Sequence, residues 1–269
     1  KKYILLLLAV CLFIVACTTN AITGRSQLSL VSEEALQQEA VTQYRNFLSQ
    51  STVVSSNTNK DAEMVKRVGS RIANAITQYF TEKGYGSELA GYKWEFNLVK
   101  NDEVNAWCMP GGKVVVYTGL LPVTQNEAAL AIVLGHEITH AVARHGQERI
   151  SQELLAQGLN VVGNIFTSGN QKANDIFNQV FIPGAQIGVL LPNSRNQELE
   201  ADHYGLLFSA MAGYNPQEAI PFWTRMMKLK EGTQQPPEFL STHPLDETRI
   251  EKLKSYMPEA LKYYKPVKN

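Results

Sequence analysis

The chain has 269 residues, of which 44% are hydrophobic, with 25 basic and 25 acidic side chains and three cysteines. These values exclude a disordered polypeptide, a collagen-like chain and a small scaffold held together by disulfides. A chain of this length buries a sizeable core in one large domain or two small ones. The zero formal charge argues against nucleic acid as the main partner, because phosphate binding draws on clustered Lys and Arg.

The N-terminal segment predicts export and attachment to a membrane. Residues 1–17 consist of two lysines, an apolar run of about 14 residues and a cysteine. The run is shorter than the roughly 20 residues that a membrane-spanning helix needs, so residues 1–16 are interpreted as a signal peptide. The last four residues, Ile-Val-Ala-Cys, resemble a bacterial lipobox, which predicts a lipid on Cys17 and a lipoprotein of the bacterial cell envelope facing the periplasm. A plain signal peptide and an uncleaved anchor are the alternatives.

The residues after the cysteine are predicted to be a tether. Residues 17–27 are mostly polar and show no periodicity, as expected of a spacer between a lipid and a folded body. Without residues 1–16 the chain keeps 23 basic and 25 acidic side chains, a net charge of −2. Cys108 is then left without a disulfide partner, and we expect it to be a small buried hydrophobe rather than a nucleophile.

The first half of the body, which we place at residues 28–269, predicts two helices and a small sheet. A helix is expected over residues 32–48, and apolar residues at three- and four-residue spacing predict another from residue 61. The alternating pattern at 94–99 predicts a half-buried strand. Residues 113–117 are predicted to form a second strand. The Pro-Gly-Gly turn before it predicts that this strand forms a hairpin with residues 104–109.

The second half is predicted to be nearly all helical, which makes the fold class α+β and mainly helical. A Thr-x-x-Glu capping box precedes a helix over 128–143, and Gly146 is a plausible stop. Residues 147–193 begin with an amphipathic stretch to about 159 and then mix Gly, Pro and apolar residues. We expect this region to be a mobile lid or plug. Further helices are predicted at 195–211, 216–230 and 246–261.

Within the helix over 128–143, residues 136–140 read His-Glu-Ile-Thr-His. Positions i and i+4 lie on one face of a helix, so the imidazoles of His136 and His140 can reach one metal ion. Glu137 lies at the edge of that site, where it can act as general base toward a water molecule. Composition alone would produce such a motif about 0.007 times, and the apolar run before it argues against two idle surface histidines.

A catalytic zinc site needs a third protein ligand and one open position. The downstream candidates are His145, His203, His243, Glu198, Glu200 and Asp202. Glu198 and Asp202 are four residues apart on one helical face, so one can bind the metal while the other accepts a hydrogen bond from a ligand imidazole. His145 lies roughly 140° around the helix from His140, which predicts a surface or capping residue.

Two candidates have a weaker case. Glu200 lies two positions from both Glu198 and Asp202, so it is expected to face away from the metal. It could replace Glu198 as a ligand only if the phase of the helix differs. His203 is expected to be an ordinary helix residue.

The pattern H-E-x-x-H followed by E-x-x-x-D resembles the M48 family of zinc metallopeptidases, which includes Oma1-, Ste24- and HtpX-like proteases. The resemblance covers roughly residues 28–255 and is strongest to the soluble or lipoprotein Oma1-like enzymes of bacterial envelopes. It extends to the block N-A-W…P-G-G…T-G-L at 105–120, to Ser194-Arg195, and to S-T-H-P at 241–244 with Arg249. Trp107 and Cys108 stand where the family often has Phe and Ala.

The resemblance implies a zincin-like (gluzincin) domain with a small sheet beside the zinc helix. By similarity, His136, His140 and Glu198 bind one Zn²⁺ per chain, and Glu137 is catalytic. Asp202 is expected to support a ligand imidazole. Two further roles are hypotheses: His243 stabilises the oxyanion of the intermediate and Arg249 orients the site. The alternatives are a helix-capping histidine and a surface arginine.

The strand around Asn105 and Ala106 is expected to offer an exposed edge that binds an extended peptide beside the metal. Together these features predict a zinc-dependent endopeptidase of the bacterial envelope, engaged in protein quality control, with unfolded or misassembled envelope proteins as substrates. The alternatives are a lipid-anchored chaperone or assembly factor with weak or latent protease activity, and a metal-binding scaffold without hydrolysis. The intact Glu137 favours catalysis.

Overall fold

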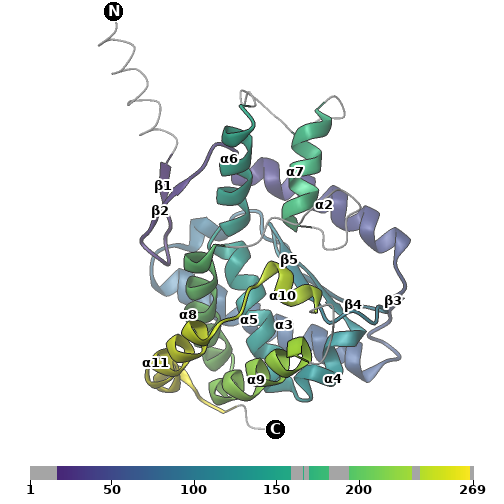
Figure 1. Ribbon diagram of the computed structural model, residues 1–269, viewed down its shortest axis with the longest axis vertical. Helices are drawn as coiled ribbons and strands as arrows, with labels where there is room; N and C mark the ends of the chain where they lie inside the picture. Colours follow the sequence, from purple (N-terminus) through teal and green to yellow (C-terminus); the bar gives the residue numbers. More distant parts are fainter. Residues whose placement is uncertain (1–16, 159–165, 167–169, 182–193, 232–236, 267–269) are drawn as a thin grey trace, which may run out of the picture.

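The computed structural model describes residues 17–158, 166, 170–181, 194–231 and 237–266 (Figure 1). Helices dominate, and a small mixed sheet lies among them, so the predicted mainly helical α+β fold class is confirmed. Within these described ranges, every helix is too short or too polar to pass through a bilayer.

The helices are α2 (Glu33–Gln50), α3 (Lys60–Glu82), α4 (Leu121–Thr124), α5 (Glu127–Val142), α6 (His145–Ala156), α7 (Gln171–Phe181), α8 (Arg195–Met211), α9 (Ala219–Glu231), α10 (Glu238–Thr242) and α11 (Glu247–Tyr263). The strands are β1 (Cys17–Thr19), β2 (Ser26–Leu28), β3 (Val53–Val54), β4 (Glu95–Val99), β5 (Ala106–Met109) and β6 (Lys113–Tyr117). Short 3₁₀ turns occur at Gly86–Leu89, Thr118–Leu120 and Pro216–Glu218.

The main sheet has the strand order β3-β4-β6-β5. The predicted hairpin is present: β5 pairs antiparallel with β6, and Trp107 lies opposite Val115. Gly111 and Gly112 form its turn at φ +75° and +80°, which side chains rarely adopt. The strand predicted at 94–99 is β4, which runs parallel to β6.

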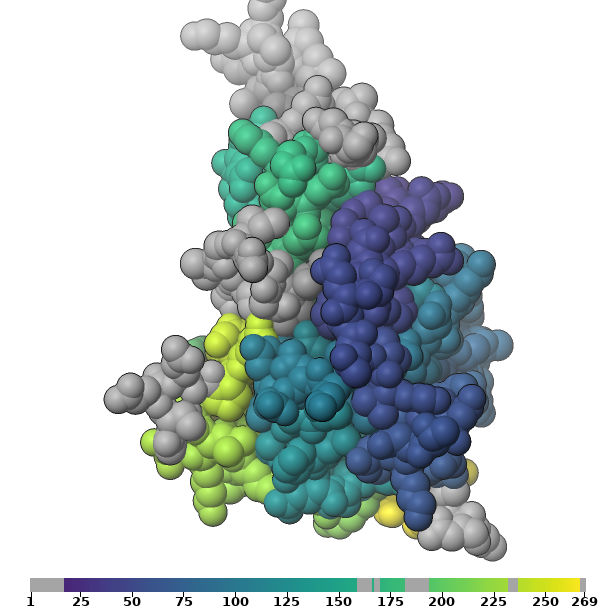
Figure 2. Space-filling view, turned by 90° about the vertical axis from the view of Figure 1, so that its right-hand side faces the viewer, coloured from purple at the N-terminus to yellow at the C-terminus, as the bar shows by residue number. Residues whose placement is uncertain are grey.

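The sheet separates two apolar clusters. Along β6, Val114 and Val116 face a core formed mainly with α3, α5, α8 and α9. Val115 and Tyr117 face the opposite cluster, which α2, α6 and α7 complete. The space-filling view shows α7, in green, against α2, in purple to dark blue (Figure 2). Both faces of β6 are therefore buried, which explains its unbroken valine run.

Two glycines let α5 and α8 approach each other closely. A Cβ on Gly205 of α8 would lie 2.7 Å from the backbone nitrogen of His136, and one on Gly135 of α5 would lie 2.6 Å from the Gly205 carbonyl oxygen. Both distances are too short for a real side chain. The absence of side chains at this crossing brings together the two helices that carry His136 and Glu198.

The chain turns sharply between α5 and α6, before the predicted stop at Gly146. Arg144 adopts a left-handed conformation with φ 56°, and α6 begins at His145. Gly146 lies inside α6, where an added Cβ would lie 2.2 Å from the Phe181 ring. The glycine therefore permits α7 to pack closely on α6 rather than ending a helix.

The prediction of a tether over 17–27 is wrong from Asn20 onward. After β1, which pairs with β2, the side chains of Asn20 and Gln27 donate hydrogen bonds to the Ala143 carbonyl, at 2.7 and 2.9 Å. Ile22 is buried in the main core. A polar sequence without periodicity looks like a spacer, but here its polar groups bond to the end of α5. Cys17 itself is exposed.

The region predicted as a mobile insertion contains two helices. The expected amphipathic stretch forms α6, whereas α7 was not predicted. Its apolar residues Ala173, Ile176, Phe177 and Val180 recur at helical spacing and join the second cluster. Residues 159–165, 167–169 and 182–193 lie outside the described part of the chain, and so does the prediction of mobility for them.

Candidate metal centre

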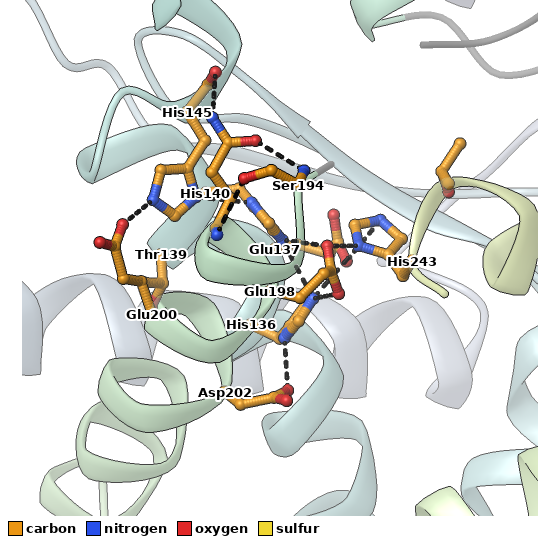
Figure 3. Close-up of polar contacts among 12 residues, drawn as sticks. His136, Glu137, Thr139, His140, His145, Ser194, Glu198, Glu200, Asp202 and His243 are labelled. Carbon is orange, nitrogen blue, oxygen red and sulfur yellow. Dashed lines mark hydrogen bonds and ion pairs between the residues drawn. The ribbon is translucent and has the colours of Figure 1, made fainter. Parts of the chain in front are cut away.

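Three elements bring four candidate ligands together. His136 and His140 extend from α5, Glu198 from α8, and His243 from the end of α10 (Figure 3). All four side chains are buried, and one donor atom from each lies within 4.8 Å of the others. The three ligands expected from the sequence therefore converge, and His243 joins them.

The spacing of these donors fits a zinc ion. The His136 Nε2 atom lies 3.1 Å from His140 Nε2 and 3.2 Å from His243 Nδ1. Glu198 Oε1 lies 3.3 Å from His140 Nε2 and 3.0 Å from His243 Nδ1. Donors at the bond lengths of tetrahedral zinc would be about 3.3 Å apart. Two imidazole nitrogens also face each other beside a carboxylate. One proton can be shared by only two of these three acceptors, whereas a metal cation can bind all three.

Asp202 supports His136 from behind. Its Oδ1 lies 3.0 Å from His136 Nδ1, on the side of the ring away from the other donors. A hydrogen bond there keeps the proton on Nδ1 and directs the Nε2 lone pair toward the ligand group. Glu198 and Asp202, four residues apart on α8, thus occupy the two places that their spacing predicts.

Arg249 contacts the acidic side chains rather than the pocket. Its guanidinium donates to both carboxylate oxygens of Asp202 at 2.7 Å, and Nη1 lies 2.7 Å from Glu198 Oε2. It also donates to the Pro244 carbonyl at 2.9 Å and lies over the Trp223 ring. Arg249 is 1% exposed, so it is not the surface arginine of the alternative interpretation. Its position is that of an orienting group.

The position of His243 differs from the one expected of an oxyanion-stabilising group. Its Nδ1 lies in the donor group, and its Nε2 lies 3.4 Å from Glu137 Oε1. The ring stacks on Phe239 with centroids 4.6 Å apart. His243 therefore lies beside both Glu137 and the other candidate ligands, and its Nδ1 would supply a fourth donor to a bound metal.

Glu137 lies in a small pocket next to this group. The pocket is lined by Ala106, Trp107, Cys108, Glu137, His140, Gly146, Arg149, Val180, Phe181, Thr242 and His243. Burial raises the pKa of Glu137, as befits a group that must accept and return a proton. Burial also raises the pKa of the Cys108 thiol well above its usual range, which agrees with the expectation that it is no nucleophile.

The edge strand β5 lies beside the pocket but is buried along its whole length. The expectation of an exposed edge is therefore wrong, because α5 packs on β5 and α7 contacts it as well. Ala106 lines the pocket, whereas Asn105 is 1% exposed and its side-chain oxygen accepts from the Ala106 N–H. A peptide could pair with this edge only if the α7 side moved.

Of the other candidates, His145 differs from its predicted position, whereas Glu200 and His203 do not belong to the ligand group. His145 is fully buried, because the turn at Arg144 redirects it toward His140. The prediction of a surface or capping residue assumed one continuous helix and is wrong. Glu200 stays outside the ligand group, as expected, but contacts His145 at 2.8 Å. His203 pairs with Glu259 at 2.7 Å on the outside of α8.

The electrostatics of the metal-free group show what a cation replaces. Burial disfavours the charged form of His136, but the carboxylates of Glu198 and Asp202 outweigh it and raise its pKa to about 9. Burial alone would keep Glu198 neutral, yet His243 and Arg249 hold its pKa well below the usual range. Burial lowers the pKa of His140 well below its usual value. The site therefore holds an ionised carboxylate that attracts a positive charge.

Comparison with known proteins places these residues in a family. The model of peptidase family M48 matches residues 59–257, which include all four candidate ligands. The mitochondrial metalloendopeptidase OMA1 of Saccharomyces cerevisiae is 36% identical over 185 residues, 66% of this chain and 51% of that protein. The Arabidopsis thaliana protein of the same name is 39% identical over 183 residues, 67% of this chain and 36% of the relative.

A bacterial relative is the beta-barrel assembly-enhancing protease of Yersinia pestis, which is 33% identical over 183 residues, 65% of this chain and 37% of the relative. The chain thus spans about half or less of the length of these curated relatives. The matched region contains the zinc-binding motif, the Glu198 helix and the His243 segment. From this match and the site geometry, the chain belongs to peptidase family M48, with the zincin-like fold that its sequence predicts.

Proposed function

We propose that this protein is a zinc-dependent endopeptidase. The observation that carries the proposal is the convergence of His136, His140 and Glu198 beside Glu137, in a pocket next to the edge strand β5. After the α7 side has moved away from β5, an extended polypeptide segment that pairs with this strand would pass Glu137 and the ligand group. The arrangement therefore suits cleavage within a chain.

The residues have distinct tasks in this mechanism. His136, His140 and Glu198 would hold the ion, and Asp202 fixes the orientation of His136. When bound, zinc lowers the pKa of water and polarises a carbonyl group. Glu137 accepts the proton of the attacking water and then donates it to the leaving amine. The apolar surroundings of Glu137 keep its carboxylate basic enough to do both.

Removal of the metal tests the proposal. The purified protein is expected to contain one zinc ion per chain and to cleave an unfolded protein such as reduced casein. A chelator should abolish cleavage, and added Zn²⁺ should restore it. The reason is that the bound ion is needed to lower the pKa of the attacking water. Zinc content by atomic absorption and cleavage by gel electrophoresis provide the measurement. Cleavage that persists in metal-free protein would refute the assignment.

We further propose that the protein acts in the bacterial envelope, anchored by a lipid on Cys17 and facing the periplasm. The support is the lipobox-like sequence before Cys17 and the exposure of that residue. The relative from Yersinia pestis is named for enhancing beta-barrel assembly, which favours unfolded or misassembled envelope proteins as substrates and a role in quality control. Incorporation of labelled palmitate in the wild type but not in Cys17→Ala tests the anchor.

The position of His243 favours a second candidate, a lipid-anchored assembly factor or chaperone whose protease activity is latent. His243 would be a fourth protein ligand and would take the position that a catalytic zinc keeps for water. His243→Ala is expected to raise the rate of casein cleavage, by about tenfold if the closed arrangement outweighs the open one by that ratio. The rate is measured beside His203→Ala, which removes a histidine remote from the ligands.

A lower rate for His243→Ala at unchanged zinc content would instead support the oxyanion role expected from the sequence.

We also propose that residues 147–193 act as a lid or plug over the pocket. Val180 and Phe181 of α7 line the pocket together with Gly146 of α6. Displacement of α7 would open β5 to a peptide.

A further inference from the structure

The second zinc-binding histidine is supported differently from the first. His136 is backed by Asp202, whereas His140 Nδ1 lies 2.8 Å from the Nδ1 of His145, another imidazole (Figure 3). On its other side, His145 Nε2 lies 2.8 Å from Glu200 Oε2. A row of three side chains therefore leads away from the ligand group: His140, His145 and Glu200.

The hydrogen bonds along this row have only one direction that suits a metal. If the His140 Nε2 lone pair faces the ion, its Nδ1 carries the proton and donates to His145 Nδ1. His145 Nδ1 is then the acceptor, so the proton of that ring is on Nε2 and is donated to Glu200. Every group in the row is satisfied in this one arrangement. Without His145, the Nδ1–H of His140 would lose its acceptor.

Arg25 completes the row from the N-terminal segment. Its Nε lies 2.7 Å from Glu200 Oε1, and its two terminal nitrogens donate to Glu148 at 2.7 and 2.6 Å. Glu148 also accepts from Gln197 at 2.8 Å. Arg25 thus connects α6, which carries His145 and Glu148, to α8, which carries Glu200 and Gln197.

The same segment holds the turn that places His145. Asn20 and Gln27 both donate to the Ala143 carbonyl at the end of α5. The next residue, Arg144, has the left-handed backbone that redirects the chain. A β-branched or bulky residue rarely keeps such a conformation without support from its surroundings. The turn and the row beyond it therefore depend on residues 20–27.

We propose that His145, Glu200 and Arg25 are positioning residues that fix the orientation and tautomer of His140, so that the segment after Cys17 contributes to metal affinity. This inference rests on the zinc site of the proposed function. Asp202, held by Arg249, does the same for His136. The two supporting carboxylates, Glu200 and Asp202, both belong to α8 and are two residues apart. In the acidic group Glu-x-Glu-x-Asp, Glu198 is thus itself a metal ligand. Glu200 supports His140 through His145, and Asp202 supports His136.

The test measures zinc affinity by competition with a chromophoric chelator, which needs no substrate. Partners of this kind change metal affinity by about 10- to 100-fold, and His145→Ala is expected to weaken zinc binding within that range. His145→Asn should recover most of the loss, because its side-chain oxygen can replace His145 Nδ1 as the acceptor for His140. His203→Ala is the matched control and should bind zinc as the wild type does.

The contribution of the N-terminal segment is tested with Arg25→Ala, which should weaken zinc binding by a smaller factor. Arg67→Ala removes an arginine that pairs with Glu127, outside the row and more exposed than Arg25, and should leave zinc binding unchanged. Co²⁺ in place of zinc should show a shifted visible spectrum in His145→Ala but not in His145→Asn. If His145→Ala does not fold, Glu200→Ala decides the question by the same measurement.

The outcomes separate the two claims. A wild-type protein that binds no zinc contradicts the proposed function itself. A wild type that binds zinc, with unchanged affinity in His145→Ala or, in its place, Glu200→Ala, overturns the positioning role and leaves the proposed function intact. Equal losses in His145→Ala and His145→Asn would show that the ring fills space rather than accepting the proton of His140.

Discussion

Glu137→Gln is expected to abolish peptide hydrolysis while the protein keeps its zinc. The carboxylate lies in the pocket beside the ligand group and does not belong to it. The amide preserves size and hydrogen bonding but cannot accept the proton of the attacking water. General acid–base catalysis contributes about 10²- to 10⁴-fold, so the cleavage rate of casein should fall by at least that factor. Zinc content and cleavage are measured on the same preparation.

The control for this variant is Glu153→Gln, which makes the same change at a partly exposed position of α6, where Glu153 accepts a hydrogen bond from Gln157. Its cleavage rate should equal that of the wild type. Undiminished cleavage by Glu137→Gln at full zinc content would show that another group moves the proton. If the wild type is largely closed by His243, the comparison is repeated in the His243→Ala background, where the faster rate makes the loss easier to measure.

Arg249→Ala is expected to have the largest effect on stability. The guanidinium is 1% exposed and pairs with both Asp202 and Glu198, which are equally buried. Its removal leaves two buried carboxylates without their cation, and breaking a buried pair in this way costs about 3–5 kcal/mol. The free energy of unfolding of the metal-free protein, measured in urea, should fall by that amount. Bound zinc should offset part of the loss, since it neutralises Glu198.

Arg67→Ala is the matched control, because Arg67 pairs with Glu127 and Glu63 where all three side chains are more than a third exposed. Exposed pairs contribute about 0–1 kcal/mol. A similar small change for Arg249→Ala would mean that Asp202 and Glu198 are protonated or hydrated without the arginine. Substitution by lysine should not restore full stability, because a single ammonium cannot make the two parallel bonds to Asp202.

The parts of the site that were predicted correctly depend on spacing within one helix. His136 and His140 share a face of α5 because they are four residues apart, and the same is true of Glu198 and Asp202 on α8. The predicted helix over 128–143 differs from α5 by one residue at each end. These relations need only the helical repeat, so the order of the residues was sufficient to find them.

The predictions that failed assumed that such a local pattern continues. The prediction for His145 assumes a continuous helix, but Arg144 takes a left-handed conformation. Glycine and asparagine are the usual residues in that conformation, and neither occurs at this position. The polar composition of residues 17–27 predicts a spacer, although Asn20 and Arg25 have partners more than 100 residues away, at Ala143, Glu148 and Glu200. Polar composition shows that a segment can be solvated; it does not show which distant groups it bonds to.

The motif and its helical repeat thus predict from residue order alone that His136 and His140 share a metal site with Glu137 beside it, and the resemblance they carry predicts the M48 family. The helical phase already favours Glu198 over Glu200 in the sequence. The buried position of Arg249, the entry of His243 into the ligand group and the row from His140 to Arg25 became clear only in the folded chain. Each of these depends on the crossing of α5 and α8 or on a turn between helices. Apart from the local contact between His140 and His145, the polar side-chain pairs involved join residues from 45 to 175 positions apart, and no repeat within a single element encodes such distances.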